Sequence, residues 1–494
     1  MKKKTISDIL NVSDIEDNKS ILIEAGTGTG KSYFIKNSLY DLAKKNNKKI
    51  LYLLNRKITK EQFYNTLNIE DKTDNTILLM TYQTIEMMMI NTDANNLKEL
   101  LEYDYLICDE FHYWFDDAQF NKNTDLSMLF ARKFNNTKIF MSATASDYTK
   151  AMVNYLGFNF DKEVIVEPNY DFINKLAFYQ NDATITEIIN DTLNKGQKVI
   201  VFMQSAKKCY DLYSLYSNKA MFLCSEGNDK YFNKVNPIKR NYLFQNQRFE
   251  DDILFTTATI DTGFNIVDPD ISTIIIDFTD KNSIIQALGR KRRASNELMD
   301  IYIKNKSKHV ILAIERSCRG RLERAGYLMS KGYEAYLKKY FKNPDKSLMV
   351  YSNFKGKLLV NKCFYVKDMA TINMCKAINK TSFAKFISKL FGKRFRKDMI
   401  LEKKNDIDEI ELYLSNRENE IMLNSKDRKE LIETFNIRSD KNNRLLKGLD
   451  ILNNALEEYD SDFRIIKVRI TKMIDGKRKD YRNAWKIIRI SEEL

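Results

Sequence analysis

A glycine-rich turn near the N-terminus limits the fold of this chain more than any other stretch. The apolar run at residues 21–23 leads into glycines that alternate with threonines, and Lys31 and Ser32 then open a segment with helical apolar spacing. Such a strand–turn–helix unit directs backbone N–H groups and the positive end of the helix dipole toward one anion. The pattern Gly-x4-Gly-Lys-Ser/Thr is met except at its first position, which is Ala25. We therefore predict a phosphate-binding loop; a Gly/Thr turn before an ordinary helix is the alternative.

The residues of this turn have expected roles in binding a nucleotide. The backbone of Gly26, Gly28 and Gly30 would cradle the phosphates, and Lys31 would reach the β- and γ-phosphates. The Ser32 hydroxyl would be a ligand of Mg²⁺. We therefore expect ATP and Mg²⁺ as cofactors of an enzyme that hydrolyses the nucleotide.

An acidic pair, Asp109 and Glu110, follows the apolar run at residues 103–108. At the carboxyl end of a strand beside a phosphate loop, Asp109 would hold Mg²⁺ through its water shell. Glu110 would orient and deprotonate the attacking water. The alternative is a solvated strand end, where Asp and Glu are common. We interpret the pair as the catalytic carboxylates of an NTPase.

Apolar runs alternate with helical stretches along the first 300 residues. This alternation predicts an α/β fold with parallel sheets, in which ligands bind outside the carboxyl ends of the strands. Further runs lie at residues 49–54, 76–80, 139–141, 198–203, 253–255 and 274–276. We expect polar residues after several of these runs to contact a bound polynucleotide: Asn55, Arg56, Thr81, Gln204 and Ser205.

Three motifs occur in order: Gly-Thr-Gly-Lys-Ser at residues 28–32, Asp-Glu-Phe-His at 109–112 and Ser-Ala-Thr at 142–144. This set resembles the first RecA-like lobe of superfamily 2 helicases. The Asp-Glu-x-His form, with Phe111 at the variable position, resembles their DEAH and flaviviral branch. No glutamine precedes Lys31, so the adenine-reading glutamine motif of DEAD-box proteins has no candidate, and a strict preference for ATP is not implied.

The pattern Gln-x-x-Gly-Arg-x-x-Arg occurs at residues 286–293. Arg290 and Arg293 are three residues apart, so on a helix they would share a face. If that face closes over the first lobe, both guanidinium groups would meet the γ-phosphate as arginine fingers, with Gln286 in the same catalytic set. A solvated basic helix end is the alternative, but the place of the pattern in the chain favours the fingers.

Residues 256–265 resemble the flaviviral motif that precedes the arginine pattern. By this resemblance Thr256 and Thr257 would contact the nucleic-acid backbone, and Gly263 would lie near the nucleotide. The resemblance covers about residues 20–300. Related unwinding enzymes carry a long strand-separating β-hairpin before the arginine pattern. Here only residues 277–285 separate the last apolar run from Gln286, so the wedge must lie elsewhere or be missing.

The region from residue 306 to 403 is basic and carries no catalytic signature. One predicted helix bears four arginines, and lysines alternate with phenylalanines between residues 385 and 397. Such patterns suit either stacking and phosphate contact on a single strand or a packed core with a solvated face. The four arginines are Arg316, Arg319, Arg321 and Arg324.

The last part of the chain, residues 404–494, is predicted to form a winged helix-turn-helix. Helices are expected at residues 406–423, from the N-cap Ser425 onward, and at 443–459. Strands at 463–470 and 485–490 would flank a turn at residues 475–476. The third helix would read the nucleic acid, and Lys477, Arg478 and Lys479 would form the wing tip. A small α+β packing domain that binds nothing is the alternative.

Charge and composition favour a polyanionic partner. The formal net charge is +14, as suits a nucleic-acid-binding protein. No apolar stretch approaches the ~20 residues needed to cross a bilayer, and no apolar secretion signal follows the N-terminus. Six cysteines occur singly, which favours free thiols in a reducing cytoplasm over zinc or disulfides. We expect a cytoplasmic protein of a bacterial host, without membrane association, that is a monomer or a weak oligomer.

These features predict four parts. Residues 1–165 and 166–305 would form two tandem RecA-like parallel-sheet lobes, 306–403 a basic helical region, and 404–494 the winged domain. The resemblance implies a nucleic-acid-stimulated ATPase that moves 3′→5′ on single-stranded or tailed nucleic acid, with DNA favoured over RNA. The Lys-, Asn- and Ile-rich composition and the winged end suggest a phage or mobile-element replication protein, with replication proteins as partners. An NTP-gated duplex-DNA translocase or remodelling switch that does not unwind is the alternative, which the short connection before Gln286 favours.

Overall fold

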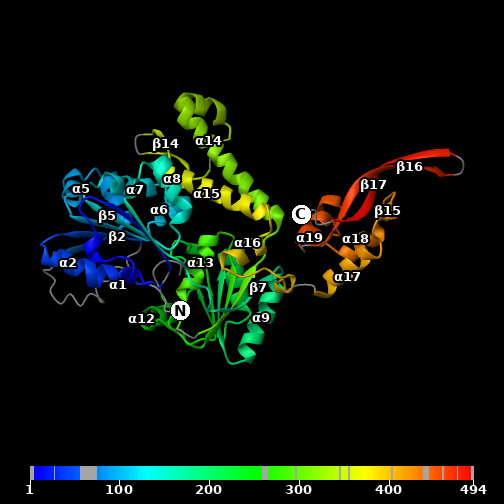
Figure 1. Ribbon diagram of the computed structural model, residues 1–494, viewed down its shortest axis with the longest axis horizontal. Coiled ribbons are helices and arrows are strands. Elements are labelled where there is room, and N and C mark those ends of the chain that lie inside the picture. Colours follow the sequence, from blue (N-terminus) through cyan, green and yellow to red (C-terminus); the bar gives the residue numbers. More distant parts are fainter. Residues whose placement is uncertain are drawn as a thin grey trace. The chain divides into compact units, whose positions relative to one another are not determined.

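The computed structural model (Figure 1) describes residues 5–26, 28–55, 75–258, 265–294, 297–343, 346–353, 356–401, 404–437, 444–458, 461–474 and 477–490. The chain divides into two compact units. The first comprises Met1–Lys175, Ile189–Ile301 and Ala313–Lys376, and the second comprises Leu176–Ile188, Tyr302–Leu312 and Ala377–Leu494. None of the described helices is both long and apolar enough to cross a membrane.

Six parallel strands form the first sheet, in the order β3-β2-β4-β5-β1-β6. The apolar runs of the sequence predicted all but the edge strand β6, in which exposed and buried residues alternate. Strand β1 lies between β5 and β6 and leads into the phosphate loop. The strands are β1 (Ser20–Ala25), β2 (Ile50–Leu54), β3 (Ile77–Thr81), β4 (Tyr105–Asp109), β5 (Thr137–Ser142) and β6 (Lys162–Val166).

Successive residues of β1 point to opposite faces of this sheet. Ile21 and Ile23 join one apolar cluster, and Leu22 joins another. The first face is covered by α1 (Lys31–Phe34), a π-helical turn (Ile35–Leu39) and α2 (Tyr40–Lys45), together with the 3₁₀ turn Ile6–Asp8. The second face is covered by α4 (Tyr82–Ile90), α5 (Ala94–Leu101), α6 (Tyr113–Asp116), α7 (Thr124–Lys133) and α8 (Ser146–Leu156).

The second sheet also has six strands, in the order β7-β12-β11-β8-β10-β9. Strand β8 pairs in parallel with β10 and β11, and β10 pairs in parallel with β9. The two sheets bear out the predicted pair of RecA-like lobes, although the sequence singled out only β8, β10 and β11. The strands are β7 (Ile173–Tyr179), β8 (Lys198–Met203), β9 (Ala220–Leu223), β10 (Ile253–Thr256), β11 (Ile271–Asp277) and β12 (Met299–Lys304).

The helices of this second set are α9 (Asp182–Asn194), α10 (Ala206–Ser214), α11 (Asp229–Phe232), α12 (Pro237–Asn246) and α13 (Lys281–Arg290). Only residues 278–280 separate β11 from α13, and Asp280 is the N-cap of α13. The predicted lack of a long hairpin at this place is therefore confirmed.

The long helix α14 (Lys308–Tyr340) carries the four arginines, as predicted, and has a non-helical residue at Gly332, where φ is 81°. A small antiparallel pair, β13 (Val350–Ser352) and β14 (Leu358–Val360), precedes α15 (Lys362–Asn379). Leu328 and Phe364 of these helices join the apolar cluster that contains Leu22. This part of the chain therefore shares a core with the first sheet.

The C-terminal elements follow the order helix–strand–helix–helix–strand–strand after α16 (Phe383–Leu390). The three strands form an antiparallel sheet in the order β15-β17-β16, with an apolar core of its own. Figure 1 shows that the β16–β17 hairpin extends well beyond the helices of this part. The elements are α17 (Lys404–Ser415), β15 (Ile421–Met422), α18 (Lys429–Phe435), α19 (Leu449–Glu458), β16 (Phe463–Ile474) and β17 (Lys477–Arg489).

Two expectations for these helices are wrong. The first helix ends at Ser415 because residues 421–422 form strand β15, which pairs with β17. The second helix begins at Lys429, so Ser425 is not its N-cap. Instead, the Asp427 carboxylate accepts hydrogen bonds from the backbone N–H groups of Leu423 and Asn424 and closes a turn. The predicted hairpin turn at residues 475–476 lies outside the described residues.

Candidate nucleotide site and adjoining cleft

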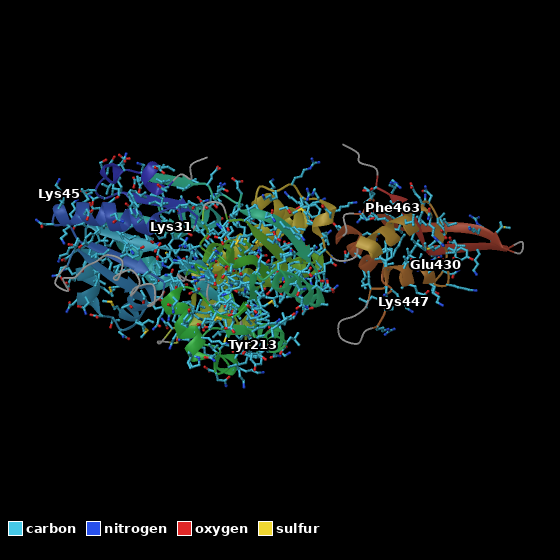
Figure 2. The ribbon with its side chains drawn as sticks, turned by 90° about the horizontal axis from the view of Figure 1, so that it is seen from below. Lys31, Lys45, Tyr213, Glu430, Lys447 and Phe463 are labelled. Atoms are coloured by element: carbon cyan, nitrogen blue, oxygen red, sulfur yellow. The ribbon has the colours of Figure 1, made fainter. Side chains whose placement is uncertain are left out.

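The phosphate loop joins the end of β1 to the start of α1. Gly28 (φ 75°) and Gly30 (φ 88°) occupy the left-handed region that glycine adopts without strain. Lys31 is the first residue of α1 and is 9% exposed. Figure 2 labels Lys31 together with Lys45, the last residue of α2, which is exposed. The backbone thus turns as a phosphate-binding loop requires.

Lys31 already faces the acidic pair. Its Nζ donates a hydrogen bond to the Ala25 carbonyl oxygen at 2.7 Å and lies 3.3 Å from Glu110 Oε1. The predicted juxtaposition of Lys31 and Glu110 is therefore observed. A lysine ammonium that contacts a carboxylate can exchange it for a phosphate oxygen, which is also anionic.

The two predicted magnesium ligands lie close together through Tyr52 of β2. The Tyr52 hydroxyl donates to Asp109 Oδ2 at 2.7 Å, and it also hydrogen bonds with the Ser32 side chain. Burial, reinforced by the Glu110 charge, raises the pKa of Asp109 to about 6. Protein sites for Mg²⁺ at nucleotides use one or two oxygen ligands, with phosphates and water completing the shell. The hydroxyl of Ser32 and the carboxylate of Asp109 fit that requirement.

Glu110 has an unusual backbone conformation for a non-glycine residue, with φ at 49°. This turn directs Oε2 to within 3.2 Å of His112 Nδ1, while Oε1 faces Lys31. Burial raises the pKa of Glu110, but the charges of Lys31, His112 and Arg290 outweigh burial and leave it lowered. Glu110 is therefore ionised, as a general base must be before it accepts a proton.

His112 connects the acidic pair to the second sheet. Its Nδ1 lies 3.0 Å from the Ser142 hydroxyl, and its Nε2 lies 2.9 Å from the Gln286 side-chain nitrogen on α13. If Nε2 accepts from the Gln286 amide, the neutral ring carries its proton on Nδ1, which faces the Ser142 hydroxyl. Burial lowers the pKa of His112, but its contact with Glu110 leaves it raised overall. The contact brings the predicted Gln286 to the site.

The two predicted arginine fingers occupy different surroundings. Helix α13 ends at Arg290, whose charge acts on Glu110. Arg293 lies beyond the helix end, because the backbone turns at Lys291 and Arg292 N–H donates to the Ile266 carbonyl. The expectation that Arg290 and Arg293 share a helix face is therefore wrong.

Arg293 packs against an aromatic ring instead of the acidic pair. Its guanidinium carbon lies 3.1 Å from the centre of the Phe172 ring, and burial lowers its pKa to about 10. The guanidinium that accompanies Arg290 near the site is Arg292, whose charge interacts with Glu110 and whose Nε donates to Asn265. Arg292 belongs to the basic run at residues 290–293, but the helical spacing of Arg290 and Arg293 did not indicate it.

A cleft of about 1320 Å³ adjoins the His112–Gln286 contact. The predicted nucleic-acid residues Asn55, Gln204 and Thr257 line it. Other lining residues that the sequence did not assign to nucleic acid come from α4, α6, α11, α13, α14 and α15, among them Gln83, Arg321, Lys367 and Thr371. The cleft thus has walls from both sheets and from the helical region.

Other predicted contacts have different surroundings. Thr81 and Ser205 are helix N-caps that accept bonds from Thr84 N–H and Lys208 N–H. Thr256 is fully buried at the end of β10. Arg56, Gly263 and the side chain of Lys477 lie outside the described residues, whereas Arg478 and Lys479 are exposed on β17.

Comparisons with known proteins bear on the first lobe. Residues 1–147 match the family described as "Type III restriction enzyme, res subunit". No curated protein matches the chain.

Among solved structures, the chain is similar to Dbp5 of S. cerevisiae, bound to RNA and ADP BeF3, with 15% identity over 58% of this chain and 78% of that one, at a TM-score of 0.42. It is also similar to the Mycobacterium smegmatis helicase Lhr bound to ssDNA and AMP-PNP (13% identity, 61% of this chain, 46% of that one, TM-score 0.41). A DEAD box protein from Methanococcus jannaschii gives 18% identity over 60% of this chain and 86% of that one, at 0.35. These scores are too low to carry an argument.

Proposed function

We propose that this chain is an ATP-hydrolysing enzyme of the superfamily 2 helicase type that moves along single-stranded nucleic acid. The match of residues 1–147 to the type III restriction enzyme res-subunit family supports this proposal. So does the meeting of the phosphate loop, the acidic pair and Arg290 in one place. The single observation that carries the proposal is the cleft beside His112 and Gln286, which is lined by polar residues at the strand ends of both sheets. A strand held there would contact both lobes at once.

In the proposed reaction the loop N–H groups and Lys31 bind the triphosphate, and Ser32 and Asp109 would hold Mg²⁺. Mg²⁺ supplies charge neutralisation at the phosphate oxygens. Glu110 orients the attacking water and takes its proton, while Arg290 stabilises charge that develops on the γ-phosphate. The charged residues of this set interact with Glu110 or Lys31. Ser32 is joined to Asp109 through the Tyr52 hydroxyl.

Hydrolysis would be coupled to movement through His112. When Glu110 changes its partners during the reaction, its contact with His112 Nδ1 would break or form again. The contact of His112 Nε2 with Gln286 would then weaken or strengthen. Gln286 lines the cleft together with Asn55 and Thr257. Alternating grip by the two lobes would then advance the strand, and binding would depend mainly on backbone phosphates and on salt.

The C-terminal part is proposed to be a winged-helix module that binds duplex or tailed nucleic acid. Its element order and the pairing of β15 with the last strand support this assignment. On the hairpin, Lys472 lies directly opposite Lys479, and like charges across a strand pair are destabilising on their own. A polyanion bound along the hairpin would relieve that repulsion.

Finer features of the proposal rest on the sequence. The resemblance of the Asp-Glu-x-His form supports 3′→5′ polarity. The Lys-, Asn- and Ile-rich composition suggests a role in phage or mobile-element replication, with DNA proposed as the track. Each of the six cysteines is a buried free thiol, which suits the cytoplasm of a bacterial host. Replication proteins are proposed as partners of the chain, which would act as a monomer or a weak oligomer.

The rate of ATP hydrolysis, measured against single-stranded DNA, duplex DNA and RNA, tests the proposal. We expect single-stranded DNA to stimulate hydrolysis most, and Lys31→Ala to abolish turnover because the phosphates lose their lysine. Lys45→Ala, on the exposed end of α2, is the matched control and should leave the rate unchanged. Hydrolysis that persists in Lys31→Ala, or that no polynucleotide stimulates, would remove the proposal.

A second candidate function is an NTP-gated duplex-DNA translocase or remodelling switch that does not unwind. The three-residue connection between β11 and α13 favours it, because the usual strand-separating hairpin is missing from that place. Strand displacement on a duplex with a 3′ tail separates the two. Stimulated hydrolysis without displacement would select the switch.

A further inference from the structure

A lysine of the helical region contacts carboxylates on both sides of the cleft. Lys367, on α15, is 6% exposed, and its Nζ lies 2.7 Å from Asp116 Oδ1 and 3.3 Å from Asp280 Oδ1. It also donates to the Tyr148 hydroxyl at 3.1 Å. None of these residues belongs to the sequence motifs, and Lys367 lines the cleft.

Each carboxylate belongs to an element that carries part of the nucleotide site. Asp116 is the last residue of α6, four residues after His112, and it also accepts a hydrogen bond from Tyr148. Asp280 is the N-cap of α13, the helix that carries Gln286 and Arg290.

The two carboxylate oxygens of Asp280 bind different partners. Oδ2 accepts from Ser283 N–H at 3.1 Å and caps α13, which leaves Oδ1 for Lys367. Movement of Lys367 relative to α6 would therefore be transmitted to the first turn of α13. The neighbouring contact of Lys281 with Asp147 joins the same turn to α8 of the first lobe.

The backbone that carries Lys367 is fixed to the first lobe. Asp368 is held by Arg321 through two hydrogen bonds of 2.7 and 2.8 Å. Asn361, just before α15, donates to the Thr124 hydroxyl of α7, and Phe364 lies in the apolar cluster of the first sheet. Lys367 is thus presented from the first-lobe side, and its bond to Asp280 is the one that extends to α13.

A buried ammonium between two carboxylates is strongly coupled to both. Burial alone would lower the pKa of Lys367, but Asp116 and Asp280 raise it well above its usual range, so the group is always charged. Without this charge, Asp116 and Asp280 would face each other unneutralised, and removing one partner of a buried ion pair is strongly destabilising. That repulsion would weaken the hold of the first lobe on the first turn of α13.

We propose that Lys367 is a positioning residue of the ATPase reaction: it holds α13, and with it Gln286 and Arg290, against the first-lobe site. The proposal rests on the proposed function, because it assigns Lys367 to the hydrolysis carried out at that site. Since Lys367 also lines the cleft, a strand bound there adjoins the same ammonium group. The helical region thereby takes part in coupling the cleft to the nucleotide.

The test is steady-state ATP hydrolysis by full-length variants with single-stranded DNA present. Lys367→Met should lower kcat by about tenfold or more, because α13 is misplaced, while the KM for ATP changes little. Lys367→Arg should keep part of the rate, since it retains the charge. Lys376→Met, an exposed lysine on the same helix, is the matched control and should behave as wild type.

A double-mutant cycle provides an independent readout. Asp280→Asn removes the charge that meets Lys367 but preserves a capping oxygen for α13, since Asn is a good N-cap. When Asp280→Asn is combined with Lys367→Met, it also removes one of the two facing carboxylates. The double variant should therefore have a higher kcat than Lys367→Met alone. If Lys367 had a merely structural role, the losses of kcat in the two single variants would add, and they would parallel the losses of melting temperature.

The outcomes separate the two proposals. Wild-type hydrolysis with an unchanged kcat in Lys367→Met, or strictly additive effects in the cycle, would overturn the role of Lys367 alone. A wild-type chain that does not hydrolyse ATP would overturn the proposed function together with this role. If Lys367→Met does not fold, Lys367→Arg and Asp280→Asn decide, and wild-type kinetics in both would overturn the role.

Discussion

At the scale of single residues, Asp125 of α7 is a carboxylate without adequate partners. It is 8% exposed, its Oδ1 has no hydrogen-bond donor among the described residues, and the Tyr351 hydroxyl lies 3.4 Å from Oδ2. Burial raises its pKa from 3.8 to about 7. The folded chain therefore keeps a proton that the unfolded chain releases near pH 4, and stability falls as pH rises from about 4 to 7.

Asp125→Asn should remove that cost. We expect its free energy of unfolding at pH 8 to exceed that of the wild type by about 2 to 4 kcal/mol, since each unit of pKa shift is worth about 1.4 kcal/mol. Urea unfolding at pH 5 and pH 8 measures the difference, which should be smaller at pH 5. An equal advantage at both pH values would mean that the carboxyl charge is not the cause.

Residue types and their order predicted much of the candidate site, because a phosphate loop and an acidic pair after a strand leave few other interpretations. Lys31 and Glu110 accordingly lie together. Contacts that depend on tertiary geometry could not be predicted. The spacing of Arg290 and Arg293 suggests one helix face, but the helix ends between them, and Tyr52 reaches Asp109 from a strand whose sequence shows only an apolar run.

At the scale of elements, the predicted strands are mostly apolar runs, and the missed strands include short or alternating ones. The edge strand β3 was predicted, whereas β12, inside the second sheet, was not. β1, β2 and β8 are continuous apolar runs, whereas β6 and β15 are short or alternate with exposed residues. Strand β15 has only two residues and exists because Ile421 and Met422 pair with β17. Such a strand follows from tertiary pairing, which no local pattern reports.

The strands β16 and β17 extend further than the predicted strands at residues 463–470 and 485–490. The outer part of the β16–β17 hairpin carries Lys472, Arg478 and Lys479, which form no ion pair among the described residues.

The double variant Arg478→Ala with Lys479→Ala should bind tailed duplex DNA more weakly. The slope of log K against log salt should fall by about 1.5 to 2, if each cation contacts one phosphate. Fluorescence anisotropy across a salt series measures the slope. Lys429→Ala on α18 is the control, and a slope equal to that of the wild type in the double variant would exclude the hairpin from the interface.

At the scale of the whole molecule, apolar cores mark which parts depend on one another. The first sheet, α14 and α15 share one apolar cluster. Composition could not predict this, because α14 and α15 are rich in both basic and aromatic residues, which suit a nucleic-acid surface as well as a packed core. The C-terminal cluster, by contrast, draws only on residues between Ile410 and Ile487. A core that is complete within one segment should fold and unfold independently of the rest.

A chain that stops after Leu401 therefore tests this division. We expect it to keep ATP hydrolysis stimulated by single-stranded DNA, because Lys31, Glu110, Gln286, Arg290 and the cleft all precede the cut. Its Kd for tailed duplex DNA should rise by about tenfold, because the phosphate contacts of the hairpin are lost. Calorimetry should show two transitions in the full-length chain and the loss of one after truncation. Loss of stimulated hydrolysis in the truncated chain, with its remaining transition intact, would mean that the C-terminal part takes part in the ATPase cycle itself.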